Sequence, residues 1–180
     1  MQLKKKNLDL FRDLKLNIIN ELSGQKKIPL SLSLREAKID SNSVKRNDIF
    51  FAIKGKKNDG NKFVKQALSK GASIAVVNKI QKNLILKPQI KVKNSLKFLT
   101  SVSKIFRENI DTKIIAITGS CGKTTLKELL GNTLKKLSKV SISPKSYNNK
   151  YGVPLSLLNL NQKDNYGVLE VGMDKKGEID

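Results

Sequence analysis

The sequence contains no histidine among its 180 residues. This absence removes serine–histidine–aspartate triads, histidine-ligated zinc sites and the commonest general base from the chemistry open to the chain. Cysteine is nearly absent too. The single one, Cys121, excludes an internal disulfide and indicates a reducing compartment. Neither a disulfide framework nor a histidine-based site is therefore expected.

Arginine and aromatic side chains are scarce as well. The net charge is +21, but only four of the 36 basic residues are arginines, and aromatic residues make up 5% of the chain. Surfaces that read bases or bind single strands usually combine arginine forks with aromatic side chains. The lysines are instead spread through every segment. Solvated lysines explain the charge better than nucleic-acid binding does, and attraction to anionic substrates is a secondary effect.

Long hydrophobic runs are also missing, since no apolar run approaches the roughly 18 residues that a membrane span needs. The first six residues include three lysines, but Asp9, Asp13 and Glu21 follow, with neither an uninterrupted apolar core nor a small-residue cleavage site. A secretion signal is therefore not expected, and the sequence predicts a cytoplasmic protein without membrane insertion.

The most informative stretch is residues 118–125, which reads Thr-Gly-Ser-Cys-Gly-Lys-Thr-Thr. It follows an apolar run typical of a buried strand, and leucines at helical spacing come after it. A strand, a glycine loop and a helix N-terminus gather backbone N–H groups around one anion. Lys123 adds a charge for the outer phosphates, and the Thr124 hydroxyl can bind Mg²⁺. These residues predict a nucleotide-binding loop, although only two residues separate Gly119 from Gly122 where the standard P-loop has four.

Glu170 lies near the end of a predicted strand over residues 166–171. In an open α/β sheet, ligands bind beyond the carboxyl ends of the strands. A carboxylate there can hold Mg²⁺ beside the Thr124 hydroxyl. The alternative is an ordinary strand-end glutamate in water. The neighbouring phosphate loop favours the metal role.

Predicted strands and helices alternate along the chain, which predicts an α/β fold with a partly parallel sheet. Asn61 is predicted to cap the second helix. The helices are expected at residues 7–22, 61–71, 95–108 and 154–160, besides the one after the phosphate loop. The strands are expected at residues 48–53, 72–77, 89–92, 113–117, 140–142 and 166–171.

Several segments taken together resemble one family, the Mur ligases, which are ATP-dependent amide-forming enzymes of peptidoglycan synthesis. Residues 118–125 resemble the family's ATP loop. Residues 40–44, 47–55, 59–61 and 71–72 follow its UDP-sugar-binding domain in order and spacing. Residues 148–155, 169–173 and 177–179 resemble the type that joins D-alanyl-D-alanine to UDP-N-acetylmuramoyl-tripeptide. The resemblance covers residues 37–180 and leaves residues 1–36 poorly matched.

The resemblance implies a small N-terminal UDP-substrate-binding α/β domain over residues 1–110. The first part of a P-loop ATPase-like central domain would follow over residues 111–180. The implied reaction starts when ATP phosphorylates the terminal carboxylate of the tripeptide. The amine of D-alanyl-D-alanine then attacks this acyl phosphate, and phosphate leaves. Such chemistry needs positioned phosphates and neutralised charge more than a strong base.

The resemblance also implies roles for residues, carried over position by position. Lys123 and Glu170 are the implied catalytic residues, and Thr124 and Glu170 the implied Mg²⁺ ligands. The substrate's uridine diphosphate end would lie near Asp40, Ser41, Lys54 and Gly55, and its muramoyl end near Asn148 and Asn149. A plain turn is the alternative for the two asparagines. The implied ATP-binding residues are Gly119, Ser120, Cys121, Gly122, Lys123, Thr124 and Thr125.

Three positions depart from the family pattern. Asn42 stands where the family usually has arginine, which removes a bidentate anion clamp. Asn61 stands in place of histidine, and Cys121 in place of a residue that is commonly asparagine. The family's modified lysine, its metal-binding histidine, its adenine-binding residues and its D-alanyl-D-alanine domain would all follow residue 180. The 180-residue chain alone is therefore expected not to complete the reaction.

Other functions stay open on the sequence. The nearest is the sibling Mur ligase that adds the third amino acid, whose counterpart of residues 148–154 looks different. A folate polyglutamylating enzyme shares the ATP loop but would lack the domain over residues 40–71. A non-catalytic nucleotide-binding or nucleic-acid-binding module is the alternative of another class, supported only by the charge and the length. Nothing in the sequence points to a particular oligomeric state.

Overall fold

The computed structural model describes residues 14–24, 32–55, 58–84, 88–144 and 147–172. The motif at residues 177–179 and the first half of the predicted helix at residues 7–22 lie outside these ranges. The chain divides into two compact units, Met1–Phe98 and Leu99–Asp180. The functional boundary expected near residue 110 stays a prediction, since packing alone defines these units.

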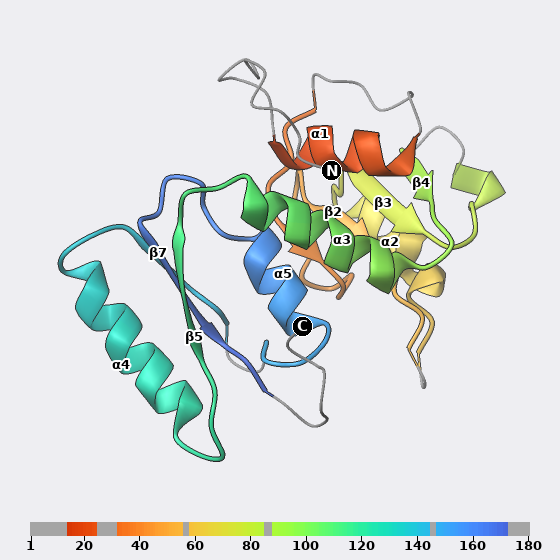
Figure 1. The fold of residues 1–180 in the computed structure, drawn as a ribbon. Coiled ribbons are helices and arrows are strands. Elements are labelled where there is room, and N and C mark those ends of the chain that lie inside the picture. The colour runs from red at the N-terminus through yellow and green to blue at the C-terminus, as the bar shows by residue number, and fades with distance from the viewer. Residues whose placement is uncertain (1–13, 25–31, 56–57, 85–87, 145–146, 173–180) are drawn as a thin grey trace. The chain divides into compact units, whose positions relative to one another are not determined.

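The first unit contains a four-stranded parallel sheet in the order β1-β2-β3-β4. Parallel strands need crossover connections, and η1 and α2 supply the one between β2 and β3 (Figure 1). The central strands β2 and β3 are buried at every residue because both faces of the sheet are covered. The elements are α1 Leu14–Ser23, β1 Ala37–Lys38, β2 Ile49–Phe51, η1 Gly60–Phe63, α2 Val64–Ser69, β3 Ile74–Val77, η2 Lys82–Leu84 and β4 Gln89–Lys91.

The second unit contains a three-stranded parallel sheet in the order β5-β7-β6, with α4 and α5 on its two sides (Figure 1). The division between the units falls within α3, Ser95–Glu108. In the second unit the Ser103 hydroxyl of α3 donates to the Pro154 carbonyl of α5, with the two oxygens 2.8 Å apart. The remaining elements are β5 Lys113–Ile117, α4 Lys123–Lys135, β6 Val140–Ile142, α5 Gly152–Leu158 and β7 Tyr166–Glu170.

The α/β class with parallel sheets is confirmed, and α3 and β5 have the predicted bounds. The predicted cap of the second helix is wrong. Asp59 precedes η1, and its carboxylate accepts the backbone N–H of Asn61 at 3.0 Å. Asp59 and Asn61 are both good cap residues, and the helical segment begins one residue earlier than expected. Likewise α5 begins at Gly152, two residues before the predicted start. Among the described residues, no helix has the length and apolar character needed to cross a membrane.

Candidate functional site

The segment between β5 and α4 is a glycine-dependent turn. Gly119 has a φ of +146° and Gly122 has a φ of +73°, both in the region that favours glycine. Gly122 is the residue from which α4 starts, and its carbonyl accepts the N–H of Leu126 at 2.9 Å. The N–H groups in the first turn of a helix have no intrahelical partner. The two glycines thus turn the chain sharply and aim the positive end of a 13-residue helix at the loop.

Lys123 lies across this loop. Its Nζ donates to the carbonyl oxygen of Gly119 at 2.6 Å and is 3.4 Å from that of Ser120. Both acceptors are neutral and exposed to solvent, so an anionic oxygen would be a stronger partner for the ammonium group. The neighbours Ser120, Cys121 and Thr125 are exposed. The loop therefore combines the positive charge of Lys123 with the backbone donors at the start of α4.

Thr124 and Glu170 meet although 46 residues separate them. The Thr124 hydroxyl donates to Oε2 of Glu170 at 2.7 Å. Because β5 pairs with β7 in parallel, with Ile117 opposite Glu170, the phosphate loop and the carboxylate emerge from the same edge of the sheet. The threonine donates its only hydrogen to the carboxylate, so its oxygen lone pairs stay available to a cation. The structure thus brings these two predicted metal ligands together.

Glu170 is buried, with an exposed fraction of 4%, and its carboxylate is held from three sides. Asn148 Nδ2 donates to Oε1 at 2.9 Å, and Lys127 Nζ lies 3.9 Å from Oε2. Burial alone would raise the pKa of this carboxyl. The hydrogen bonds from Thr124 and Asn148, with the charges of Lys127 and Lys123, outweigh burial and hold the pKa below its ordinary value. Glu170 is therefore ionised at neutral pH.

Lys127, whose Nζ lies beside this carboxylate, is a residue that the sequence did not single out. It points inward from α4 with an exposed fraction of 0%, whereas the neighbouring Leu126 and Leu129 are 52% and 66% exposed. A leucine pattern on a helix usually marks the buried face, which here holds Lys127 and Gly131. Gly131 is the one residue of this helix that could have indicated its buried face, because a Cβ there would lie 2.4 Å from Ile142 Cδ1. The glycine allows the helix to pack closely at this point, but it does not predict that Lys127 is buried.

Asn148 and Asn149, both predicted to lie near the substrate, make different contacts. Asn148 contacts Glu170, and its carbonyl accepts the N–H of Gly172 at 2.6 Å. Asn149 accepts the backbone N–H groups of Tyr151 and Gly152 at 3.0 and 3.1 Å, which orders the start of α5. Asn149 thus forms the turn that was the alternative, while Asn148 belongs to the cluster around the carboxylate. A contact of either residue with substrate stays a prediction.

In the first unit, Asp40 and Ser41 follow β1 and belong to a turn. Asp40 Oδ1 accepts the N–H of Asn42 at 2.9 Å, and the buried Ser41 hydroxyl donates to Gln66 Oε1 at 2.8 Å. Gln66 also donates to the side-chain oxygen of Asn42 at 3.0 Å. Asn42, which replaces an arginine of the family pattern, therefore ties the turn to α2. The role of Asp40 and Ser41 toward substrate stays a prediction.

Lys54 lines a cavity of about 440 Å³ together with Asp59 and Asn61. It forms an isolated bridge with Asp59, and the N–H of Gly55 donates to the Asn58 carbonyl at 2.8 Å. The carboxylate of Asp59 accepts hydrogen bonds from the side-chain amide of Asn61 and from its backbone N–H, and these bonds, the first more than the second, hold the pKa of Asp59 below its ordinary value. The other lining residues are Lys62, Lys65, Asn78, Lys79, Gln81, Asn83 and Leu84.

Asn61, which replaces a histidine of the family pattern, organises this cavity. Its Nδ2 donates to Asp59 Oδ1 at 2.7 Å, and its Oδ1 accepts the backbone N–H of Asn78 at 3.0 Å. Asn78 in turn accepts the Ser95 hydroxyl at 3.1 Å. The network links the start of η1 and the end of β3 to the start of α3. Among the described residues, the walls of the cavity are polar and include four lysines and one carboxylate.

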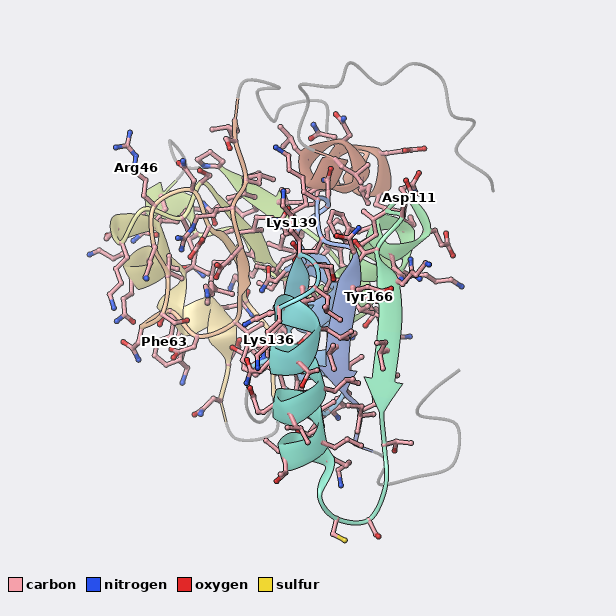
Figure 2. The ribbon with its side chains drawn as sticks, turned by 90° about the vertical axis from the view of Figure 1, so that its left-hand side faces the viewer. Arg46, Phe63, Asp111, Lys136, Lys139 and Tyr166 are labelled. Carbon is pink, nitrogen blue, oxygen red and sulfur yellow. The ribbon has the colours of Figure 1, made fainter. Side chains whose placement is uncertain are left out.

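A larger cavity, of about 910 Å³, lies at the amino ends of the second unit's strands. Lys136, Lys139, Asp111 and Tyr166, labelled in Figure 2, are among its lining residues. They lie at the end of α4 that is remote from the phosphate loop (Figure 2). None of the predicted site residues lines this cavity.

The donor set around Glu170 fits a magnesium ion. Mg²⁺ is usually held by one or two protein oxygens, with substrate phosphates and water completing its shell. The ionised carboxylate and the Thr124 hydroxyl are such oxygens. The part of the chain that the structure describes has no group of three or more histidine, cysteine, aspartate or glutamate residues that could hold a metal by itself. The arrangement suits an ion that arrives with a phosphate ligand.

The fold and the loop define a class of protein. The Mur ligase family catalytic domain matches residues 34–107, and the Mur ligase middle domain matches residues 117–180. The chain belongs to the Mur ligase family. Within the family it is of the MurF type, and it corresponds to the N-terminal third of those enzymes.

The individual relatives agree with this assignment. The UDP-N-acetylmuramoyl-tripeptide–D-alanyl-D-alanine ligase of Buchnera aphidicola subsp. Baizongia pistaciae is 36% identical over 152 residues, which are 83% of this chain and 33% of that enzyme. The MurF structure from Acinetobacter baumannii has a TM-score of 0.76 at 32% identity, covering 91% of this chain and 36% of that one. MurF ligase from Thermotoga maritima, solved in complex with ADP, has a TM-score of 0.68 at 34% identity, covering 83% and 34%. The chain thus spans about a third of the length of these relatives.

Proposed function

We propose that this chain supplies the UDP-substrate-binding and ATP-binding parts of a ligase that joins D-alanyl-D-alanine to UDP-N-acetylmuramoyl-tripeptide in the cytoplasm. The contact between Thr124 and Glu170 supports the proposal best, because a hydroxyl and a carboxylate, which are groups that can bind Mg²⁺, are in contact next to the glycine turn. The names of the relatives supply the substrates. The boundary between the two parts is proposed near residue 110.

The proposed roles follow from the contacts. Backbone N–H groups after Gly119 and Gly122 bind the phosphates, and Lys123 moves from its carbonyl partners onto the outer phosphate oxygens. Thr124 and Glu170 hold Mg²⁺, which neutralises charge on the phosphates when it is bound. Asn148 fixes the direction of the Glu170 carboxylate. In this way the residues position the phosphates for attack without a side-chain base.

The first test is the dependence of ATP binding on Mg²⁺. We expect Glu170→Gln to weaken ATP binding by about tenfold with Mg²⁺ present, because an amide replaces an ionised ligand. In EDTA the affinity should stay at the wild-type value, since the phosphate loop is unchanged. Isothermal titration calorimetry with ATP measures both affinities.

Asp111→Asn is the matched control for this test. It makes the same chemical change at an exposed carboxylate in the second unit, at the remote end of β5. Equal affinities for the Glu170 and Asp111 variants with Mg²⁺ present would contradict the metal role of Glu170.

The second test concerns the basic cavity of the first unit, where we propose that Lys54 binds the diphosphate of the UDP-linked substrate. Lys54→Ala is expected to weaken binding of UDP by about five- to tenfold, through loss of one charge-assisted hydrogen bond. Lys97→Ala, an exposed lysine of the same unit outside the cavity, is the control. If both variants bind UDP equally well, the diphosphate lies elsewhere.

A further inference from the structure

Lys127 is an unusual residue for the inside of a protein. Lysine is almost never fully buried unless it is paired, and Lys127 has an exposed fraction of 0%. Its Nζ donates to the Ser143 carbonyl at 2.8 Å and lies 3.4 Å from Glu128 Oε1 and 3.9 Å from Glu170 Oε2. The ammonium group thus has three oxygen neighbours, two of which are carboxylates.

A buried ion pair rarely serves stability. Taking both charges out of water is costly, and an apolar side chain of similar size is often as stable or more stable at such a position. Leucine and methionine are also good helix formers, so the helix itself does not require a lysine at position 127. The reason for a charged side chain at position 127 therefore lies in the groups that its ammonium contacts.

Those contacts converge on the carboxylate of Glu170. Ser143, which accepts the Lys127 ammonium, also accepts the backbone N–H of Glu170 through its hydroxyl at 3.1 Å, and its own N–H donates to the Val168 carbonyl at 2.9 Å. Lys127 therefore ties α4 to the carboxyl ends of β6 and β7. Its charge also faces Oε2, the oxygen that accepts the Thr124 hydroxyl.

Thr124 and Lys127 are three residues apart on α4 and therefore lie on the same face of the helix. Asn148 donates to Oε1, the other oxygen of Glu170. Both carboxylate oxygens are thus directed by neighbours, and each keeps lone pairs for a cation, because a carboxylate has about four acceptor positions.

We propose that Lys127 is a positioning residue of the nucleotide site: its buried ammonium group holds the ionised Glu170 carboxylate against Thr124 in the orientation that receives Mg²⁺. The inference rests on the proposed function, since it concerns the same metal ligands. Lys127 acts through Glu170 and does not touch the nucleotide. Without its charge, the carboxylate is free to turn away from Thr124.

The experiment measures ATP affinity of the 180-residue chain by calorimetry, with Mg²⁺ and with EDTA. For Lys127→Met we expect the affinity with Mg²⁺ to fall by about tenfold, as is typical when a neighbour of a metal ligand is lost. The affinity in EDTA should equal that of the wild type. Lys135→Met makes the same change at an exposed position of α4 and should alter neither affinity.

A double-mutant cycle separates positioning from general packing. In a Glu170→Gln background, Lys127→Met should cause no further loss, because the group through which it acts has already been changed. Lys127→Gln keeps a hydrogen-bond donor for Ser143 but has no charge. We therefore expect its ATP affinity with Mg²⁺ present to fall as that of Lys127→Met does. Circular dichroism verifies that each variant is folded. If Lys127→Met does not fold, the ATP affinities of Lys127→Gln with Mg²⁺ and with EDTA provide the test.

Two results would overturn the inference: wild-type or tighter ATP binding with Mg²⁺ in the folded Lys127 variants, or an equal loss in the wild-type and Glu170→Gln backgrounds. The first would mean that the charge is dispensable, and the second that the lysine acts independently of Glu170. A wild-type chain whose ATP binding does not depend on Mg²⁺ would overturn the proposed function itself. The two failures are therefore distinguishable.

Discussion

Replacing Lys123 by alanine is expected to weaken ATP binding by about 10- to 100-fold, because the variant loses a charge-assisted contact with phosphate. The loss should appear both with Mg²⁺ and in EDTA, since Lys123 acts on the phosphates directly. This distinguishes it from Glu170→Gln, whose effect requires the metal ion. Calorimetry under both conditions measures the difference.

The change at Lys123 should leave the fold intact. Its ammonium group donates to two carbonyl oxygens of an exposed loop, which water can satisfy in its absence. Lys135→Ala, at the other end of α4, is the matched control and should bind ATP as the wild type does. If the two alanine variants had the same affinity, the loop over residues 118–125 would not be the triphosphate site.

Phe50→Ala is expected to lower the free energy of unfolding by about 3–5 kcal/mol, which is the usual range for removing a buried phenylalanine side chain. Phe50 lies at the centre of β2, where it is paired with Lys38 of β1 and Ala75 of β3, and it has an exposed fraction of 0%. A whole domain is stable by only about 5–15 kcal/mol. The expected loss is therefore a large fraction of the stability of such a unit.

Phe63→Ala provides the control for this loss. Phe63 belongs to the same unit but is 42% exposed. We expect a change below about 1 kcal/mol there, as for most surface substitutions. Because the sequence has no tryptophan, urea denaturation followed by far-UV circular dichroism is the suitable measurement. Equal shifts for both variants would contradict the assignment of Phe50 to the core.

The elements that could be predicted from the sequence are those with a local pattern. The apolar residues of α3 repeat at helical spacing over residues 95–108, and the helix has these bounds. The run of β-branched residues at 113–117 is β5. The start of η1 was misplaced because Asp59 and Asn61 compete for the same role, and only the backbone geometry shows that Asp59 is the acceptor.

The candidate site was partly predictable for a similar reason. A glycine loop between a strand and a helix was visible in consecutive residues, and Glu170 could be placed because parallel strands end at one edge of a sheet. Asn148 was expected near the substrate, but nothing in the sequence indicated its hydrogen bond to Glu170. That contact depends on how the loop before α5 packs against the end of β7.

The α/β class, the resemblance to the Mur ligases and the glycine-rich turn after β5 could all be inferred from the residues alone. These inferences depend on short runs of residues whose backbone preferences and spacing act locally. Which side of α4 faces the sheet, in contrast, follows from the three-dimensional packing. That choice left Leu126 and Leu129 in water and buried Lys127 beside Glu170. The physical reason is that a helix has several faces, and long-range packing against β6 and β7 selects the one that is buried.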